Sequence, residues 1–153
     1  MNGTIETIKV YSAKGMPGKE VSEAMLKENF GLEGDFHAQG GDRQLSLLCA
    51  ETRDLMTQQK EKGLCFSRFK ENITIRGLCG TLRSGVRLEA GEEADAENSV
   101  VLEITGETKS CHNECPLYEA GKQCPLSGMS LFVKVIKGGI IRAGDQVTVK
   151  AEP

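Results

Sequence analysis

The sequence predicts an all-β fold, a closed or nearly closed β-barrel with one or two peripheral helices, and three observations predict it. Glycine accounts for 18 of the 153 residues, and glycine is frequent in the tight turns that join antiparallel strands. Short segments rich in β-branched residues recur between those turns. One segment alone, residues 51–62, has the length and composition of a long helix. Because closure removes exposed strand edges, a barrel accommodates many short strands.

The first part of the chain is predicted to open with a strand and to continue through loops. Residues 4–11 alternate apolar and polar side chains for most of their length, which is typical of a strand with one buried face. Residues 13–18 contain two glycines and a proline, which end that strand. The apolar residues between Val21 and Leu26 are spaced so that they fit one or two helical turns.

A buried strand, one helix and five further strands complete the prediction. Residues 44–49 are mostly apolar, which indicates a buried strand. Residues 51–62 contain strong helix formers and are followed by Gly63, a typical helix end. The further strands, each short and bounded by glycines or polar turns, are predicted at residues 72–76, 86–90, 100–105, 131–136 and 146–150.

Composition and charge exclude several classes of protein. With 19 basic and 22 acidic residues, the net charge is −3, so the chain lacks the cationic excess that neutralises nucleic-acid phosphates. No run approaches the roughly 20 apolar residues of a membrane span, and the first ten residues show no secretory signal. We therefore expect a cytoplasmic protein with no nucleic-acid or membrane partner, built as a single domain over residues 1–153.

Three of the six cysteines cluster in the sequence, with a histidine beside the first. The cluster comprises Cys111, His112, Cys115 and Cys124. It fits a zinc site, which would make the chain a zinc-binding interaction or structural domain without catalysis. It also fits a reactive thiolate at Cys111, because Lys109 and His112 place positive charge beside that thiol. A third interpretation is a surface loop whose thiols have no special role.

The other three cysteines are scattered along the chain. Cys49, Cys65 and Cys79 have apolar neighbours in the sequence. Buried cysteine is common, and a reducing cytosol keeps thiols unpaired. We expect these three to be inert thiols in or near the core.

Two further motifs carry polar side chains suited to ligand contact. The first joins Asp35, His37 and Arg43 in a glycine-rich stretch, where the backbone can approach a ligand closely. The alternative is a turn whose carboxylates bond local amides, with His37 on the surface. The second motif places Arg68 and Asn72 ahead of a predicted strand, where a guanidinium can bind phosphate or another oxyanion. The alternative is a surface ion pair between Arg68 and Glu71 or Glu51.

Taken together, these motifs resemble the MOSC family, named for the molybdenum cofactor sulfurase C-terminal domain. The resemblance covers nearly the whole chain. It implies a mostly β barrel of the pyruvate-kinase-barrel type, which agrees with the strand pattern. The segments that carry it, in the family's order, are residues 31–37 with Arg43, 68–75, 102–112, 132–139 and 144–145.

The resemblance also implies a function and roles for named residues. Cys111 matches the family's key cysteine, which carries sulfur as a persulfide or ligates the molybdenum of the pterin cofactor. Arg68 and Asn72 match an arginine and an asparagine beside that cofactor in relatives. The family's other signature is occupied by Asp35, His37 and Arg43.

The predicted site follows from these implications. We expect catalytic roles for Cys111, His112, Asp35 and His37, and cofactor binding by Arg68, Asn72, Arg43 and Lys109. Cys111 would ligate molybdenum, while Cys115 and Cys124 would be further metal ligands or would resolve a persulfide as a disulfide. The predicted partners are molybdenum cofactor, the enzymes that make or accept it, and a cysteine desulfurase as sulfur donor. The sequence leaves open whether the protein is an enzyme or a carrier.

Overall fold

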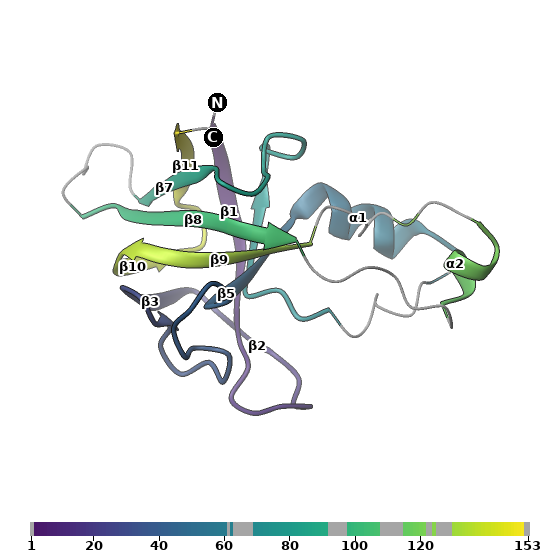
Figure 1. Ribbon diagram of the computed structural model, residues 1–153, viewed down its shortest axis with the longest axis horizontal. Helices are drawn as coiled ribbons and strands as arrows, with labels where there is room; N and C mark the ends of the chain where they lie inside the picture. The colour runs from purple at the N-terminus through teal and green to yellow at the C-terminus, as the bar shows by residue number, and fades with distance from the viewer. Residues whose placement is uncertain are drawn as a thin grey trace.

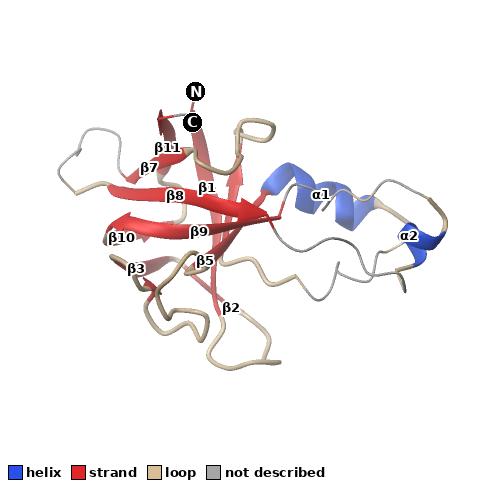
Figure 2. Ribbon diagram, in the orientation of Figure 1, coloured by secondary structure: helices blue, strands red, loops and turns tan. Residues whose placement is uncertain are grey.

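The computed structural model describes residues 2–60, 62, 69–91, 98–107, 115–121, 124 and 130–151. Figure 1 shows strands gathered on one side of the molecule and helices on the other, and Figure 2 shows the same division by colour. The strands are β1 (Asn2–Val10), β2 (Lys19–Val21), β3 (Glu23–Lys27), β4 (Gly31–Leu32), β5 (Leu45–Cys49), β6 (Ile73–Arg76), β7 (Arg87–Gly91), β8 (Val100–Glu107), β9 (Ser130–Lys137), β10 (Gly139–Arg142) and β11 (Gln146–Ala151), and the helices are α1 (Ala50–Gln58) and α2 (Pro116–Glu119).

The main sheet closes on itself. Its strands lie in the order β11, β7, β8, β9, β5, β6, β1 and β2, and a further pairing of β1 with β11 joins the two sides into a seven-stranded barrel. At the closure, Asn2 lies opposite Thr148 in an antiparallel register. The predicted closed β-barrel is therefore confirmed.

One pair of barrel strands is parallel. β5 and β6 run in the same direction, with Leu47 opposite Ile73 and Cys49 opposite Ile75. A parallel pair cannot be joined by a tight hairpin and needs a crossover connection. Helix α1, which lies between β5 and β6 in the chain, is part of that connection.

Strand β5 explains why residues 44–49 lack an alternating pattern. All five of its residues are buried. Leu45 and Leu47 belong to the hydrophobic core of the barrel, whereas Leu48 packs with Met56 of α1 in a second cluster. Because both faces of the strand are covered, both carry residues shielded from water. The barrel core also includes the alternating inward residues Leu131, Val133 and Val135 of β9.

The structure corrects the helical turns predicted between Val21 and Leu26. Val21 ends β2, and the residues from Glu23 onward form β3, which pairs with β10 and with β4 in a small second sheet. Met25 lies opposite Ile140, and the buried Leu26 lies opposite Gly139. Pairing with a distant strand outweighs the local helical spacing here, as tertiary context commonly does.

The predicted helix is confirmed, but it is shorter than expected. Helix α1 ends at Gln58, because Gln59 adopts an extended backbone while its N–H still donates to the carbonyl of Leu55. Lys62, predicted to lie within the helix, donates from Nζ to the carbonyl oxygen of Met56 (2.6 Å) and to that of Thr57 (3.0 Å). It therefore caps carbonyls at the end of the helix instead of extending it. The predicted stop at Gly63 lies outside the described residues.

The short helix α2 was not predicted. It begins at Pro116, a residue favoured at the first helical position because its ring fixes φ and its missing N–H is not needed there. In the described part of the chain, neither helix has the length and apolar character needed to cross a membrane.

Candidate functional site

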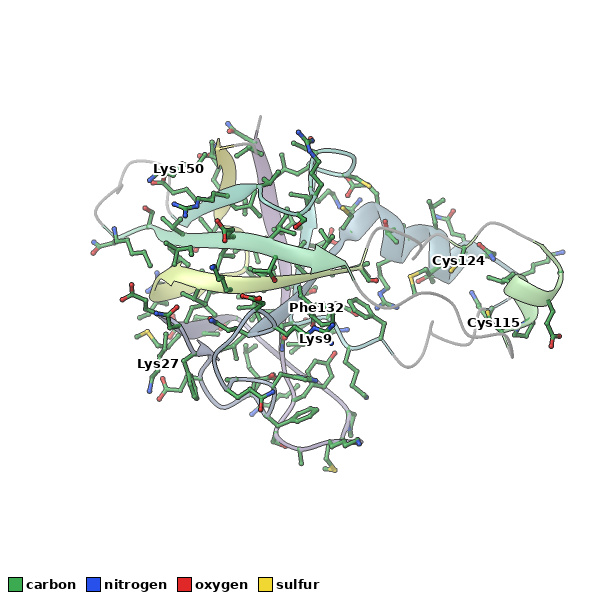
Figure 3. The ribbon with its side chains drawn as sticks, in the orientation of Figure 1. Lys9, Lys27, Cys115, Cys124, Phe132 and Lys150 are labelled. Atoms are coloured by element: carbon green, nitrogen blue, oxygen red, sulfur yellow. The ribbon has the colours of Figure 1, made fainter. Side chains whose placement is uncertain are left out.

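A pocket of about 200 Å³ opens at the wall of the barrel. Strands β5 and β9 supply part of its lining, and the segments that precede β5 and β6 supply the rest. Figure 3 labels Phe132 on β9, close to where the strands meet the helical side of the molecule. The residues around the pocket are His37, Arg43, Leu45, Ser46, Phe69, Lys70 and Phe132.

A buried carboxylate lies behind His37. The side chain of Asp35 is fully buried. Its Oδ1 accepts hydrogen bonds from the backbone N–H of Tyr11 (2.8 Å) and from Nδ2 of Asn72 (3.0 Å). Burial opposes ionisation, but hydrogen bonds from His37 and Tyr11 outweigh burial and hold the pKa of Asp35 below its usual value. Asp35 is therefore an anion at neutral pH.

Asp35 also fixes the orientation of the His37 ring. Its Oδ2 accepts from the backbone N–H of His37 (3.0 Å) and lies 2.9 Å from His37 Nδ1. A carboxylate only accepts, so Nδ1 carries a proton, and Nε2 is the ring nitrogen that remains for a ligand or a proton. The ring of Phe36 lies 3.8 Å from that of His37, centre to centre, and limits its movement. The result is an aspartate–histidine dyad with the histidine on the pocket.

Asn72 connects this dyad to the barrel. Its Nδ2 donates to the carbonyl oxygen of Lys9 (3.1 Å) as well as to Asp35. Its Oδ1 accepts from the backbone N–H of Ser46 (3.0 Å) and from the Ser46 hydroxyl (3.3 Å). Two donated and two accepted bonds use the full capacity of a primary amide. Asn72 therefore positions Asp35 and Ser46 from behind the pocket wall.

Glu71 forms a second buried charge cluster beside the pocket residues. It is 2% exposed, its carboxylate forms an ion pair with Arg53, and its Oε1 lies 3.5 Å from Nζ of Lys9. The Tyr11 hydroxyl donates to the carbonyl oxygen of Glu71 at 3.1 Å. A buried carboxylate needs such partners. The cluster ties β1, α1 and the segment before β6 together.

Two cations border the pocket. The Arg43 guanidinium lies 4.7 Å from the centre of the Phe132 ring. Nζ of Lys70 lies 5.4 Å from the centre of the Tyr11 ring. Within the described residues, neither forms a salt bridge with a carboxylate. Cations held over aromatic rings beside a pocket suit an anion with a flat, unsaturated ring.

The structure brings together four of the residues that the sequence singled out. Asp35, His37 and Arg43 surround the pocket or support its wall, and Asn72, the residue just before β6, joins them. The carboxylate of Asp35 does bond local amides, as the alternative interpretation expected, but His37 is half-buried and lines the pocket. The predictions for Arg68, Lys109, Cys111 and His112 lie outside the described residues.

The remaining clustered cysteines lie on the helical side of the molecule (Figure 3). Cys115 is 4% exposed. Cys124 is partly buried and packs against the cluster of Leu48 and Met56, to which Phe69 of the pocket also belongs. Among the described residues there is no group of three or more side chains that could hold a metal ion. The predicted metal roles of Cys115 and Cys124 therefore stay predictions.

Sequence reasoning missed several pocket residues. Ser46 and Leu45 lie on a strand predicted only as buried, and Phe69, Lys70 and Phe132 were treated as flanking residues of other motifs. Lys70 is followed directly by Glu71 and Asn72, which precede the apolar strand predicted from residue 72. Three polar residues in a row beside an apolar strand could have indicated that this segment contributes to a site.

The fold and site define a small closed β-barrel protein with a cation-bordered pocket and an aspartate–histidine dyad at its wall. The model of the MOSC domain matches residues 33–148, so the chain belongs to the MOSC domain family. A comparison with curated protein sequences finds no significant match.

Solved structures share this fold. The YUAD protein from Bacillus subtilis superposes with a TM-score of 0.65 at 17% identity, covering 96% of this chain and 94% of that one. YiiM from Escherichia coli has a TM-score of 0.57 at 19% identity, covering 100% and 71%. YiiM from Geobacillus stearothermophilus has a TM-score of 0.65 at 14% identity, covering 97% and 75%. At these identities the likeness concerns the fold.

Proposed function

We propose that this protein binds molybdenum cofactor, or carries sulfur to it, through Cys111. The observation that supports the proposal most directly is a pocket in a MOSC-family barrel that combines two cations, aromatic rings and an oriented histidine. Molybdenum cofactor is a flat pterin with an anionic phosphate and a pair of sulfur ligands. When bound, it supplies a redox-active metal that soft sulfur ligands hold.

The pocket residues fit part of such a group. A pocket of about 200 Å³ is smaller than the roughly 300–1,000 Å³ typical of sites for drug-sized ligands. The pocket would therefore hold only one end of the cofactor, a phosphate or a single ring. Arg43 and Lys70 suit the phosphate, and Phe132 and Phe69 suit the face of a ring.

The dyad suits proton transfer. Asp35 keeps Nδ1 of His37 protonated, so Nε2 is free to accept a proton and later to return it. The imidazolium that forms is stabilised by the buried carboxylate. In this role His37 serves as an acid and base, Asp35 orients it, and Asn72 holds Asp35 in place.

The remaining roles fall on residues whose positions come from the sequence alone. Cys111 would supply the thiolate, Lys109 and His112 would favour its deprotonation, and Arg68 would bind the phosphate together with Arg43. In sulfur carriage, the Cys111 thiolate attacks the terminal sulfur of a persulfide on a cysteine desulfurase. The sulfur–sulfur bond of the donor breaks, its thiolate leaves, and Cys111 holds the sulfur as a new persulfide.

Mass spectrometry of the intact protein tests sulfur carriage. The protein is incubated with a cysteine desulfurase and free cysteine, and its mass should rise by about 32 Da, one sulfur atom. Cys111→Ser should remove the increase, and Cys124→Ser, which retains Cys111, should keep it. An unchanged wild-type mass contradicts sulfur carriage.

Cofactor binding has a separate test. The wild-type protein and Arg43→Ala are titrated with molybdenum cofactor released from a donor protein, and the retained pterin is measured by the fluorescence of its oxidation product. We expect the wild-type protein to retain pterin and Arg43→Ala to retain about tenfold less, because a charge-assisted hydrogen bond contributes about 1.5–3 kcal/mol. No retention by the wild-type protein would contradict binding.

A further inference from the structure

The chain has a second pair of thiols, separate from the cysteine cluster of the sequence. Cys49 is the last residue of β5 and is 1% exposed. Cys79 lies in the turn after β6 and is exposed, and both residues are free thiols. The first turn of α1 brings them together, since Oγ1 of Thr52 lies 4.0 Å from Sγ of Cys79, and α1 begins directly after Cys49.

Two contacts hold the segment that contains Cys49 against the turn that contains Cys79, namely Thr52 Oγ1 to Cys79 Sγ and Glu51 Oε2 to the N–H of Gly77. Burial raises the pKa of Cys49, and the Cys79 thiol raises it further. The exposed Cys79 is the thiol that a reagent in solution reaches first, and Cys49 lies behind it. This is the arrangement of an attacking and a resolving cysteine. The sequence predicted inert thiols in or near the core; Cys49 is buried, whereas Cys79 is exposed.

A buried carboxylate oxygen lies beside this pair. Glu51, in the first turn of α1, accepts the backbone N–H of Gly77 with Oε2 at 2.9 Å. Its Oε1 is buried and has no hydrogen-bond partner in the described part of the molecule. The Glu51 charge also contributes to the raised pKa of Cys49. A buried oxygen without a donor is unusual, so it is available as a proton acceptor when the Cys49 thiol reacts.

We propose that Cys49 and Cys79 are a peroxide-sensitive dithiol that closes to a reversible disulfide. The Cys79 thiolate attacks one oxygen of hydrogen peroxide, the O–O bond breaks, and the hydroxide that leaves takes up the proton lost by the thiol. The Cys49 sulfur then attacks the Cys79 sulfenic acid, passing its proton to Glu51. The S–O bond breaks, and the hydroxide that leaves takes that proton from Glu51. Two thiols lose two electrons, and one peroxide becomes two waters.

The disulfide would act on the segment that supplies one side of the pocket. The loop that it closes, residues 49–79, contains α1 together with Phe69 and Lys70 of the pocket. Ser46, also at the pocket, lies on the strand that ends at Cys49. Oxidation would therefore limit the movement of two parts of the pocket wall, the strand that ends at Cys49 and the segment that contains Phe69 and Lys70. The inference concerns residues that the proposed function does not use, so either can fail alone.

Peptide mass spectrometry tests the proposal on the full chain. Reduced protein is treated with hydrogen peroxide, the free thiols are blocked, and the digest is analysed without reduction. We expect a disulfide-linked pair of peptides, one containing Cys49 and the other Cys79. Its mass should be two hydrogens below the summed masses of the two peptides, and dithiothreitol should separate them again. Cys79→Ser should remove the link, and Cys124→Ser, the matched control, should retain it. With Cys49→Ala, a trapping reagent should find Cys79 as a sulfenic acid.

Other outcomes overturn the proposal. These are a Cys79 that goes directly to sulfinic acid in the wild-type protein, a link between Cys79 residues of two chains, or a link that survives in Cys79→Ser. Glu51→Gln keeps the shape of the side chain but cannot accept the proton. It should slow disulfide closure without slowing the first oxidation of Cys79, and an unchanged closure rate would remove Glu51 from the mechanism.

Discussion

Replacing Asp35 by asparagine should destabilise the protein, although the two side chains have nearly the same shape. The carboxylate accepts four hydrogen bonds, from the N–H of Tyr11, from Asn72, and from the backbone and ring of His37. An amide presents one oxygen and one NH₂ group, so it can accept only on one side. Two of the four hydrogen-bond donors would then face the NH₂ group of the new asparagine, which is itself a donor.

The size of the effect follows from the burial of this group. Bonds to a charged acceptor contribute about 1.5–3 kcal/mol each, and the Asp35 side chain is fully buried, so solvent screens little of that. Losing two bonds lowers the free energy of unfolding by about 3 kcal/mol or more. For a chain of this length, about 1 kcal/mol corresponds to roughly 2–4 °C in melting temperature. Asp35→Asn should therefore melt about 6–12 °C below the wild-type protein.

The effect should depend on pH in a defined direction. The pKa of Asp35 is lowered in the folded state, so its ionised form stabilises the fold above the unfolded value of about 3.9. That stabilisation is lost as pH falls through the lower, folded pKa. The gap in melting temperature between the wild-type protein and Asp35→Asn should be constant near neutral pH and should narrow below about pH 4.

Thermal unfolding followed by circular dichroism between pH 3 and pH 8 measures both quantities. The control is Asp42→Asn, a neighbouring carboxylate that is exposed and should change the melting temperature little. The reasoning is refuted if Asp35→Asn melts with the wild-type protein at pH 7, or if the gap widens as pH falls.

Three further predictions concern the barrel and its connections. Leu47→Ala, in a fully buried position of the barrel core, should cost about 2–5 kcal/mol in chemical denaturation, and a loss below about 1 kcal/mol would contradict the packing. Gly31→Ala places a Cβ 2.6 Å from the carbonyl oxygen of Gln44 at a φ of +131°, so the folded yield should fall. The control Gly41→Ala shares the strain of a positive φ (+79°) but meets no atom within 4 Å, so its folded yield should fall less. Equal yields would be inconsistent with the close approach at Gly31. Arg53→Ala removes one ion-pair partner of the buried Glu71, so the free energy of unfolding measured in urea should fall by about 3 kcal/mol or more. An unchanged free energy of unfolding would show that Lys9 alone is enough to stabilise the Glu71 carboxylate.

The strand pattern predicted the barrel because burial alternates with a period of two on most strands. β9 illustrates this, since Leu131, Val133 and Val135 all reach the core. The prediction for Val21–Leu26 was wrong because a six-residue run carries too little periodicity to separate helix from strand. Its partner, β10, lies more than a hundred residues away, and no local signal records that pairing.

The site was predicted in part for a similar reason. Asp35, His37 and Arg43 stand close in the sequence, so their proximity in space needed only a compact turn. The links through Asn72 to Lys9 and Ser46 join β1, β5 and the start of β6, and such contacts depend on the closure of the sheet. The dithiol of Cys49 and Cys79 was missed because apolar neighbours in the sequence do not determine whether a turn residue is exposed.

The most direct test of the proposed function is elemental analysis of the purified protein after incubation with molybdenum cofactor and, separately, with a cysteine desulfurase and cysteine. Molybdenum and excess sulfur are counted per chain in the wild-type protein and in Cys111→Ser. The proposal predicts about one molybdenum or about one additional sulfur atom per wild-type chain, lost in Cys111→Ser. Neither element above background in the wild-type protein, or equal amounts in both proteins, would contradict it.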